Sequence, residues 1–244
     1  MTAVTPILEL ENVSKSFGSL RVISELSLSI RQDEAVGIIG PNGAGKTTLF
    51  NLVSGNLNPD SGRIFLRGRD ITALPPHRRC HAGVGRTYQV PHPFEGMTVF
   101  ENVLVGAAFG NATSEREAHR AGAEALERTG MAPLANKLAG SLTLLERKRL
   151  ELTRAVATAP AVLLLDELAG GLTEPEVRQL VAIIRQLHKE GIAIVWIEHV
   201  VHALLSAVQR LVVIHANSIL IQGVPAAIMA SPEVQRVYLG IGVE

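Results

Sequence analysis

The segment Gly-Pro-Asn-Gly-Ala-Gly-Lys-Thr at residues 40–47 constrains the fold of this chain more than any other feature of the sequence. It follows the continuous apolar run Ala35–Ile39, which is typical of a strand buried on both faces of a parallel sheet. A helical pattern over residues 48–53 comes directly after it. Because the pattern G-x-x-x-x-G-K-S/T between a buried strand and a helix is that of a phosphate-binding loop, we predict an α/β fold that binds the phosphates of a nucleotide.

The residue types of this loop fit the chemistry of a polyphosphate. Glycines leave the backbone N–H groups open to close approach, and the start of the following helix adds about half a positive charge. The Lys46 ammonium is expected to neutralise the β- and γ-phosphates, and the Thr47 hydroxyl to bind Mg²⁺. The alternative is a glycine-rich turn with a solvent-exposed lysine, which leaves the flanking strand and helix unexplained. The residues expected to contact ATP are Gly40, Pro41, Asn42, Gly43, Ala44, Gly45, Lys46, Thr47 and Thr48.

Polar residues that follow two other apolar runs are candidates for the same site. Asp166 and Glu167 come after the run Val162–Leu165, and His199 comes shortly after Ile192–Ile197. In open α/β sheets, ligands bind at the carboxyl ends of the strands. We therefore expect Asp166 to hold Mg²⁺ through water and Glu167 to orient or deprotonate the attacking water. Taken alone, an Asp-Glu pair is as readily a helix-capping turn, and a lone histidine or glutamine is more often structural.

The charge balance and composition exclude several classes of protein. The 244 residues contain 23 Lys+Arg and 23 Asp+Glu, so there is no net positive charge for binding nucleic acid or an anionic lipid surface. With 47% hydrophobic residues, the chain has enough material for a core and is not disordered. The single Cys80 excludes an internal disulfide, and no stretch approaches the ~20 continuous apolar residues of a membrane span. We expect a folded, cytosolic protein.

Taken in order, the motifs resemble the ATP-binding subunits of ABC transporters over nearly the whole chain. That order is an early aromatic residue, the phosphate-binding loop, a glutamine, a helix-capping signature, the Asp-Glu pair and a late histidine. The resemblance implies that Phe17 stacks on adenine. It also implies that Gln89 is the lid glutamine, which binds Mg²⁺ and links the nucleotide site to the membrane subunits. Asp166, Glu167 and His199 are then the metal carboxylate, the catalytic base and the switch histidine.

The resemblance also sets the expected architecture. It implies an α/β P-loop NTPase core with a mostly parallel sheet, an N-terminal antiparallel β element and an inserted helical subdomain. Residues 1–244 are expected to form one ABC ATPase domain. Within it, residues 1–90 and 155–244 form the core with its β subdomain, and residues 91–154 form the helical subdomain. Three Ser/Thr-x-x-Glu pairs predict helix starts at Ser114, Thr143 and Thr173.

Two segments resemble a narrower group within this family. GVGRTYQVPHPFEGMTVFENVLVGA (residues 83–107) and KRLELTRAVAT (148–158) are similar to ATPases of bacterial importers for branched-chain amino acids and related small polar solutes, such as urea or amides. The tail PEVQRVYLG (232–240) fits this group too, but the ATPases of lipopolysaccharide exporters end similarly. An exporter ATPase of the lipopolysaccharide type therefore stays open as an alternative.

The signature motif departs from the family pattern. Where the family has Leu-Ser-Gly-Gly-Gln or Leu-Ser-Tyr-Gly-Gln, this chain has Leu142, Thr143, Leu144, Leu145 and Glu146. In the family, this helix closes over the ATP held by the partner subunit, so the change affects the partner's site. The added side chains obstruct close approach, and Glu146 adds negative charge. We expect the Thr143–Glu146 capping pair and the adjacent Lys148 and Arg149 to compensate, which leaves an altered but working geometry. The alternatives are weakened closure of the dimer and a weakly active regulatory partner in a heterodimer.

The resemblance implies particular partners as well. The chain is expected to form a homodimer, or a heterodimer with a sibling ATPase, and to lie at the cytoplasmic face of the cell membrane against transmembrane permease subunits. A periplasmic solute-binding protein would be an indirect partner, and nucleic acid is not expected. The permease contact is expected over Val90–Val103, with Phe94, Met97 and Phe100 in a groove, although each residue alone is more typical of a core. The loop Leu168–Thr173 lacks the family's Pro and Asp, which puts communication across the dimer in doubt.

Two further readings compete with transport. A small-molecule kinase with a phosphate-binding loop would need an arginine-rich lid over a second substrate, and residues 110–140 offer none. A nucleotide-dependent module for DNA repair or translation would carry coiled-coil arms, zinc modules or two ATPase units, which this sequence lacks.

Overall fold

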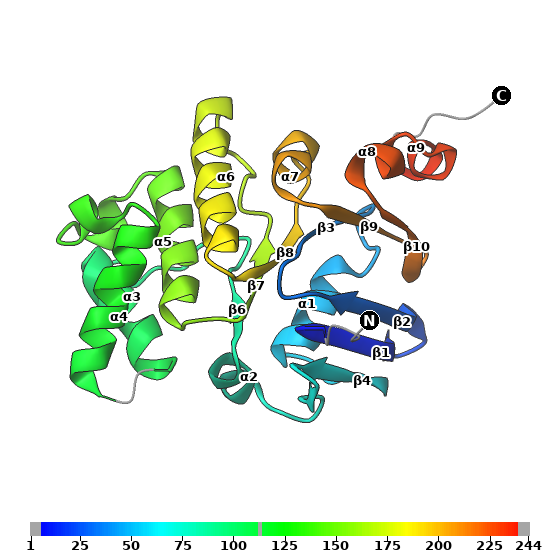
Figure 1. Cartoon of the computed structure of the whole chain (residues 1–244), viewed down its shortest axis with the longest axis horizontal. Coiled ribbons are helices and arrows are strands. Elements are labelled where there is room, and N and C mark those ends of the chain that lie inside the picture. Colours follow the sequence, from blue (N-terminus) through cyan, green and yellow to red (C-terminus); the bar gives the residue numbers. More distant parts are fainter. Residues whose placement is uncertain (1–5, 112–113, 239–244) are drawn as a thin grey trace.

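The computed structural model of the chain describes residues 6–111 and 114–238, which form two sheets and a group of helices (Figure 1). The first sheet is antiparallel, with the strand order β2-β1-β4-β5. Its strands are β1 (Leu8–Phe17), β2 (Leu20–Ile30), β4 (Ser61–Leu66) and β5 (Arg69–Asp70). This sheet confirms the antiparallel β element predicted at the start of the chain.

The second sheet has six strands in the order β10-β9-β3-β8-β7-β6. All neighbouring pairs are parallel except β9 and β10, which form an antiparallel hairpin. Its strands are β3 (Ala35–Ile39), β6 (Val84–Arg86), β7 (Val162–Asp166), β8 (Ala193–Ile197), β9 (Arg210–His215) and β10 (Ser218–Gly223). The three central strands β3, β7 and β8 are buried over their whole length, as continuous apolar runs predict.

Helices surround this sheet and extend to one side of it (Figure 1). They are α1 (Lys46–Ser54), α2 (Pro76–Ala82), α3 (Val99–Phe109), α4 (Glu115–Arg128), α5 (Leu144–Ala157), α6 (Glu174–Lys189), α7 (Val201–Ala207), α8 (Pro225–Met229) and α9 (Pro232–Tyr238). Helices α3, α4 and α5 pack on one another at the left of Figure 1, where we expect the helical subdomain. Its boundaries at 91 and 154 stay a prediction.

The predicted helix starts are all present. Ser114 accepts a hydrogen bond from the Glu117 N–H at 3.3 Å, and Thr143 forms a reciprocal capping box with Glu146. At Thr173, the Glu176 carboxylate accepts from the Thr173 N–H at 2.8 Å. Thr98 begins α3 with a further capping box that the sequence reading did not single out. The same reading missed α2, β4, β5 and the edge strand β6, because these elements are short and none of them is a continuous apolar run.

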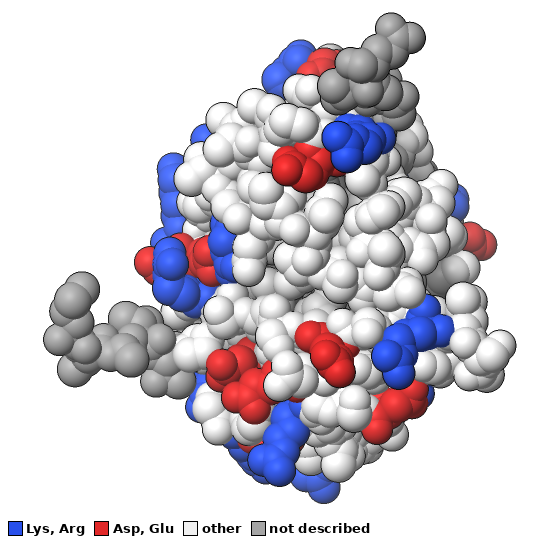
Figure 2. Space-filling view, turned by 90° about the vertical axis from the view of Figure 1, so that its right-hand side faces the viewer, with Lys and Arg blue, Asp and Glu red and all other residues white. Residues whose placement is uncertain are grey.

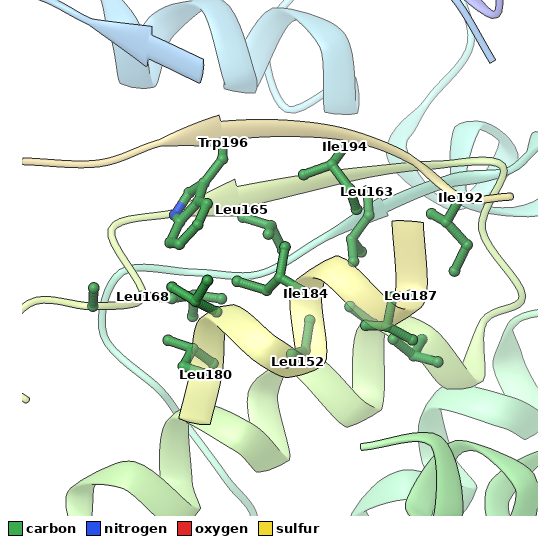
Figure 3. Packing of buried hydrophobic residues seen from close by; sticks show 14 of the residues in the cluster. Leu152, Leu163, Leu165, Leu168, Leu180, Ile184, Leu187, Ile192, Ile194 and Trp196 are labelled. Atoms are coloured by element: carbon green, nitrogen blue, oxygen red, sulfur yellow. The ribbon is translucent and has the colours of Figure 1, made fainter. Parts of the chain in front are cut away.

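The core lies on both faces of the parallel sheet, because alternate residues of a strand point to opposite sides. On β7, Leu163 and Leu165 pack in the cluster covered by α5 and α6, whereas Leu164 packs in the cluster that includes α1 and the antiparallel sheet. Figure 3 shows the first cluster, with Trp196 and Leu165 facing Leu180 of α6. Both sides of β7 and β8 are therefore fixed, which holds their carboxyl ends in place.

The helices and the charged surface bear on contacts with lipid and nucleic acid. Among residues 6–111 and 114–238, no helix combines the length and the apolar character needed to cross a lipid bilayer. On the face shown in Figure 2, acidic and basic side chains are interspersed and much of the surface is uncharged. This face carries no broad positive patch of the kind that binds nucleic acid.

Candidate nucleotide-binding and hydrolysis site

The loop between β3 and α1 is packed so closely that two of its positions accept only glycine. A Cβ on Gly40 would lie 2.2 Å from the carbonyl oxygen of Ile214, and one on Gly45 would lie 2.7 Å from that of Val22. Gly45 also has φ +97°, which side chains disfavour. The loop is thus held between the end of β9 and strand β2.

Helix α1 begins with amide groups that no side chain caps. Its N-cap residue is Gly45, which has no side chain to accept a hydrogen bond from the first turn. The N–H groups of such a turn bind anions, and the helix dipole favours negative charge there. Thr47 is exposed and Thr48 is half-buried in this first turn. This arrangement fits the predicted phosphate-binding loop.

Lys46 lies over the loop rather than in solvent. Its Nζ donates to the carbonyl oxygens of Gly40 at 2.7 Å and Pro41 at 3.0 Å, and only 6% of the residue is exposed. Burial lowers the pKa of Lys46, while the nearby carboxylates of Glu167 and Asp166 oppose that shift. The ammonium is therefore positioned inside the loop, next to acidic groups from another strand. The alternative of a solvent-exposed lysine on a glycine-rich turn is wrong.

The sheet order brings the other predicted residues to the same edge. Strands β6, β7 and β8 are consecutive and parallel, so their carboxyl ends lie side by side. Asp166 ends β7 and pairs with Ile197 of β8, and Glu167 follows with its N–H bonded to the Ile197 carbonyl at 2.9 Å. Residues separated by more than thirty positions in sequence thus meet because parallel strands end together.

Glu167, Gln89 and His199 form a hydrogen-bonded cluster. One carboxylate oxygen of Glu167 accepts from Gln89 Nε2 at 2.5 Å, and the other lies 3.0 Å from His199 Nε2. Glu167 has φ +47°, an uncommon backbone conformation outside glycine, and Lys148 of α5 donates to its carbonyl oxygen at 3.2 Å. The three side chains predicted separately from the sequence therefore contact one another.

Asp166 forms a buried ion pair that the sequence reading missed. Its Oδ2 lies 3.2 Å from Nη2 of Arg86, and both side chains are nearly fully buried. Burial raises the pKa of Asp166, whereas the Arg86 guanidinium lowers it. Arg86 begins the segment Arg-Thr-Tyr-Gln, three residues before the predicted site residue Gln89. That position was the only indication in the sequence that Arg86 could lie at the site.

Glu198 is a second residue that sequence reasoning did not identify. Its carboxylate is buried and accepts hydrogen bonds from the N–H groups of Ala169 at 2.8 Å, His199 at 2.9 Å and Val200 at 3.2 Å. The side chain thereby ties the loop after Glu167 to the loop that carries His199. Its place at the carboxyl end of β8, directly before a predicted site residue, was the signal in the sequence.

The donor set at this edge fits Mg²⁺. Thr47 offers a hydroxyl, Gln89 an amide oxygen and Asp166 a carboxylate, and oxygen donors are what this ion prefers. No group of three or more His, Cys, Asp or Glu side chains that could hold a metal occurs within the described part of the chain. Magnesium binds through one or two carboxylates and takes its other ligands from water and substrate phosphates.

Phe17 lies at the end of β1, at the turn into β2. Its side chain is 48% exposed, and Lys15 Nζ lies 5.9 Å from the ring centroid. Val22, farther along β2, contacts the phosphate-binding loop at Gly45. The exposed ring is free to stack on a nucleotide base; that role stays a prediction.

The altered signature forms a well-capped start of α5. Leu142 and Leu145 are buried, whereas Leu144 is 46% exposed. Thr143 and Glu146 form the capping box, and Lys137 pairs with Glu146 at 2.9 Å. Hydrogen bonding to Lys137 lowers the pKa of Glu146. The negative charge that we predicted here is thus balanced by Lys137.

Of the two cations expected to compensate, Lys148 points away from Glu146, whereas Arg149 lies close enough for the Glu146 charge to oppose the lowering of the Arg149 pKa by burial. Lys148 is buried and donates to the backbone of Glu167, and Arg149 donates to the carbonyl oxygens of Thr129 at 2.8 Å and Gly130 at 2.6 Å. Lys148 is two positions from Glu146 and therefore faces another direction, whereas Arg149, three positions away, lies on the same side of the helix and is half-buried.

Comparison with known proteins identifies the family. The ABC transporter family matches residues 23–170. The chain is 37% identical over 252 residues to the high-affinity branched-chain amino acid transport ATP-binding protein BraF of Pseudomonas aeruginosa, spanning 96% of this chain and 98% of that protein. It is also 35% identical over 234 residues to the lipopolysaccharide export system ATP-binding protein LptB of Haemophilus influenzae, spanning 96% and 97% respectively.

Solved structures give the same result for the fold. A nucleotide-free ATP-binding cassette from an ABC transporter matches with a TM-score of 0.89 at 29% identity, over 98% of this chain and 100% of that one. An ATP-binding cassette of an ABC transporter in its ADP conformation matches with a TM-score of 0.87 at 29% identity, over 97% and 99%. With the loop around Lys46 and the polar strand ends beside it, these matches show that the chain belongs to the ABC transporter ATP-binding family and is an ATPase.

Proposed function

We propose that this chain is the ATP-hydrolysing subunit of an ABC importer for branched-chain amino acids or related small polar solutes such as amides and urea. The observation that carries the proposal is the contact of Glu167 with Gln89 and His199 beside the Lys46 loop. The 37% identity to BraF, a branched-chain amino acid transport protein, supports this substrate class.

The proposal assigns a role in ATP binding or hydrolysis to each predicted site residue. Lys46 and the first amides of α1 bind the β- and γ-phosphates. Glu167 accepts a proton from the water that attacks the γ-phosphorus. His199, whose Nε2 lies 3.0 Å from the Glu167 carboxylate, orients that carboxylate. Phe17 stacks on the adenine. Thr47, Gln89 and Asp166 hold Mg²⁺, which when bound neutralises charge on the phosphate oxygens.

Two copies of the chain, or this chain and a sibling ATPase, pair so that the helix start at Thr143 faces the partner's nucleotide. The exposed Leu144 would lie in that interface, since 46% of it is uncovered in the single chain. The capped N-terminus of α5 keeps its backbone N–H groups and dipole although both signature glycines are absent. We therefore favour an active altered site over a regulatory subunit without activity.

A cavity of about 380 Å³ is the place we propose for a permease helix at the cytoplasmic side of the membrane. Helices α2, α3 and α5 and strand β6 line it, and Phe109 at its rim is 78% exposed. This site differs from the one predicted within residues 90–103. Phe94, Met97 and Phe100 do not line the cavity, and Phe100 packs against the core. Tyr88, one residue before Gln89, lines it instead and connects it to the nucleotide site.

A lipopolysaccharide exporter is the second candidate, because LptB is also similar at 35% identity. The two candidates differ in a measurable way. If the chain is replaced by its Glu167→Gln variant in the cell, an importer loses uptake of radiolabelled leucine. An exporter instead retains leucine uptake and loses surface lipopolysaccharide.

The hydrolytic role of Glu167 is tested on the purified chain. Glu167→Gln keeps the side chain's size but removes the proton acceptor, so we expect ATP binding to persist and turnover to fall by about 100-fold or more. The readouts are phosphate release and binding of a fluorescent ATP analogue. Glu174→Gln is the control, since that glutamate is exposed at the start of α6. Turnover at the wild-type rate in Glu167→Gln would remove Glu167 from the mechanism.

A further inference from the structure

Arg86 connects the two elements that carry the proposed metal ligands. Its Nη1 donates to the Asn51 side chain at 2.7 Å and to the Ser54 hydroxyl at 2.9 Å, both on α1. Its Nη2 lies 3.2 Å from Oδ2 of Asp166, the last residue of β7. Helix α1 begins with Lys46 and Thr47, so one guanidinium spans from the phosphate-binding helix to the metal carboxylate.

The guanidinium is itself held in a fixed orientation. It lies 5.8 Å from the ring centroid of Phe50 and 4.9 Å from that of Tyr88. Its side chain is 6% exposed, and its Nε is buried with no hydrogen-bond partner among the described residues. The two rings and the acceptors on Asn51, Ser54 and Asp166 together fix the position of the guanidinium.

The ion pair uses one oxygen of the carboxylate and leaves the other available. Oδ2 of Asp166 faces Arg86, while Oδ1 accepts no hydrogen bond within the described residues. A monodentate contact of this kind fixes the rotation of a carboxylate without occupying both of its oxygens. Groups behind a metal ligand commonly orient it in this way.

We propose that Arg86 is a positioning residue that orients Asp166 for Mg²⁺ and fixes its distance from α1. This inference rests on the proposed metal site and adds a residue to it. Arg86 touches neither nucleotide nor metal in this scheme; it acts through Asp166. Removing it should therefore change how much Mg²⁺ is needed to bind nucleotide tightly, and should leave metal-free binding at the Lys46 loop unchanged.

The test is a MgCl2 titration of TNP-ATP fluorescence with the full chain, compared with binding in EDTA. In Arg86→Met, we expect the MgCl2 midpoint to rise by about tenfold or more, the range seen when groups behind metal ligands are removed. Affinity for TNP-ATP in EDTA should stay at the wild-type value. Arg154→Met is the matched control. Arg154 and Arg86 both line the cavity proposed for the permease helix. Arg154 lies 5.2 Å from the ring centroid of Phe94, but its carboxylate partner is Glu151 and not Asp166.

Two further variants cover a failure of Arg86→Met to fold, which an unpaired buried Asp166 would explain. Arg86→Lys keeps the charge but cannot reach all three acceptors, and Asn51→Ala frees the guanidinium on its α1 side; both should raise the midpoint by a smaller factor. A wild-type midpoint in Arg86→Met, or in both of these variants if it does not fold, would overturn the inference. If Mg²⁺ fails to tighten TNP-ATP binding to the wild-type chain, the proposed metal site itself is refuted.

Discussion

Arg79 on α2 offers a prediction about what holds the phosphate-binding helix in place. The side chain is fully buried and donates to four backbone carbonyl oxygens, those of Leu52, Val53, Thr72 and Leu74. The first two lie near the carboxyl end of α1, where the helix leaves carbonyl groups without partners. Arg79 therefore caps the far end of the helix that begins at Lys46.

The magnitude follows from two opposing terms. Replacing Arg79 by methionine leaves four carbonyl groups without this donor, at about 1 kcal/mol each. Burial lowers the pKa of Arg79 to about 10, which shows that keeping the cation away from water costs free energy. Removing the cation removes this desolvation cost and so offsets part of the lost hydrogen-bond energy. We expect a net destabilisation of about 2–4 kcal/mol, and a melting temperature lower by about 10 °C for a chain of this size.

The assay is urea and thermal denaturation of the full chain, followed by circular dichroism. Arg78→Met is the matched control, because Arg78 neighbours Arg79 on α2 but is exposed, and its change should stay within about 0.5 kcal/mol. An equal loss in the two variants, or an Arg79→Met variant as stable as the wild type, would refute the capping argument.

Two other predictions concern binding and pH. Lys46→Ala should weaken TNP-ATP binding by about 10–100-fold, since a charge-assisted contact to phosphate is lost; unchanged affinity would reject the phosphate-binding loop. Burial raises the pKa of Glu151 above its model-peptide value of 4.5, so the folded chain holds a proton that the unfolded chain has lost. The free energy of unfolding should therefore fall as pH rises from the unfolded-state pKa to the raised folded-state pKa of Glu151. Glu151→Gln should flatten the decline in urea midpoints measured between about pH 4.5 and 7. The same pH dependence in the variant and the wild type would contradict this.

Local patterns determined much of the fold and of the candidate site. The apolar runs at Ala35–Ile39 and Val162–Leu165 predicted buried strands because a strand covered on both faces must be apolar throughout. Ser-x-x-Glu and Thr-x-x-Glu pairs predicted helix starts because capping involves residues three apart. The same reasoning placed Asp166 and Glu167 at a strand end and Lys46 where the phosphate-binding loop meets a helix, as the structure has them.

Only the tertiary structure decided which of these residues meet. Arg86 and Asp166 are 80 positions apart, and their pairing depends on β6 lying beside β7, an order that no local period encodes. The hydrogen bonds of Lys148 to Glu167 and of Arg149 to Thr129 likewise depend on how α5 packs. Sequence periodicity indicates whether a residue is buried, because the geometry of a strand or helix determines which residues share a face. It does not record which distant partner covers that residue, since that contact is set by the packing of whole elements.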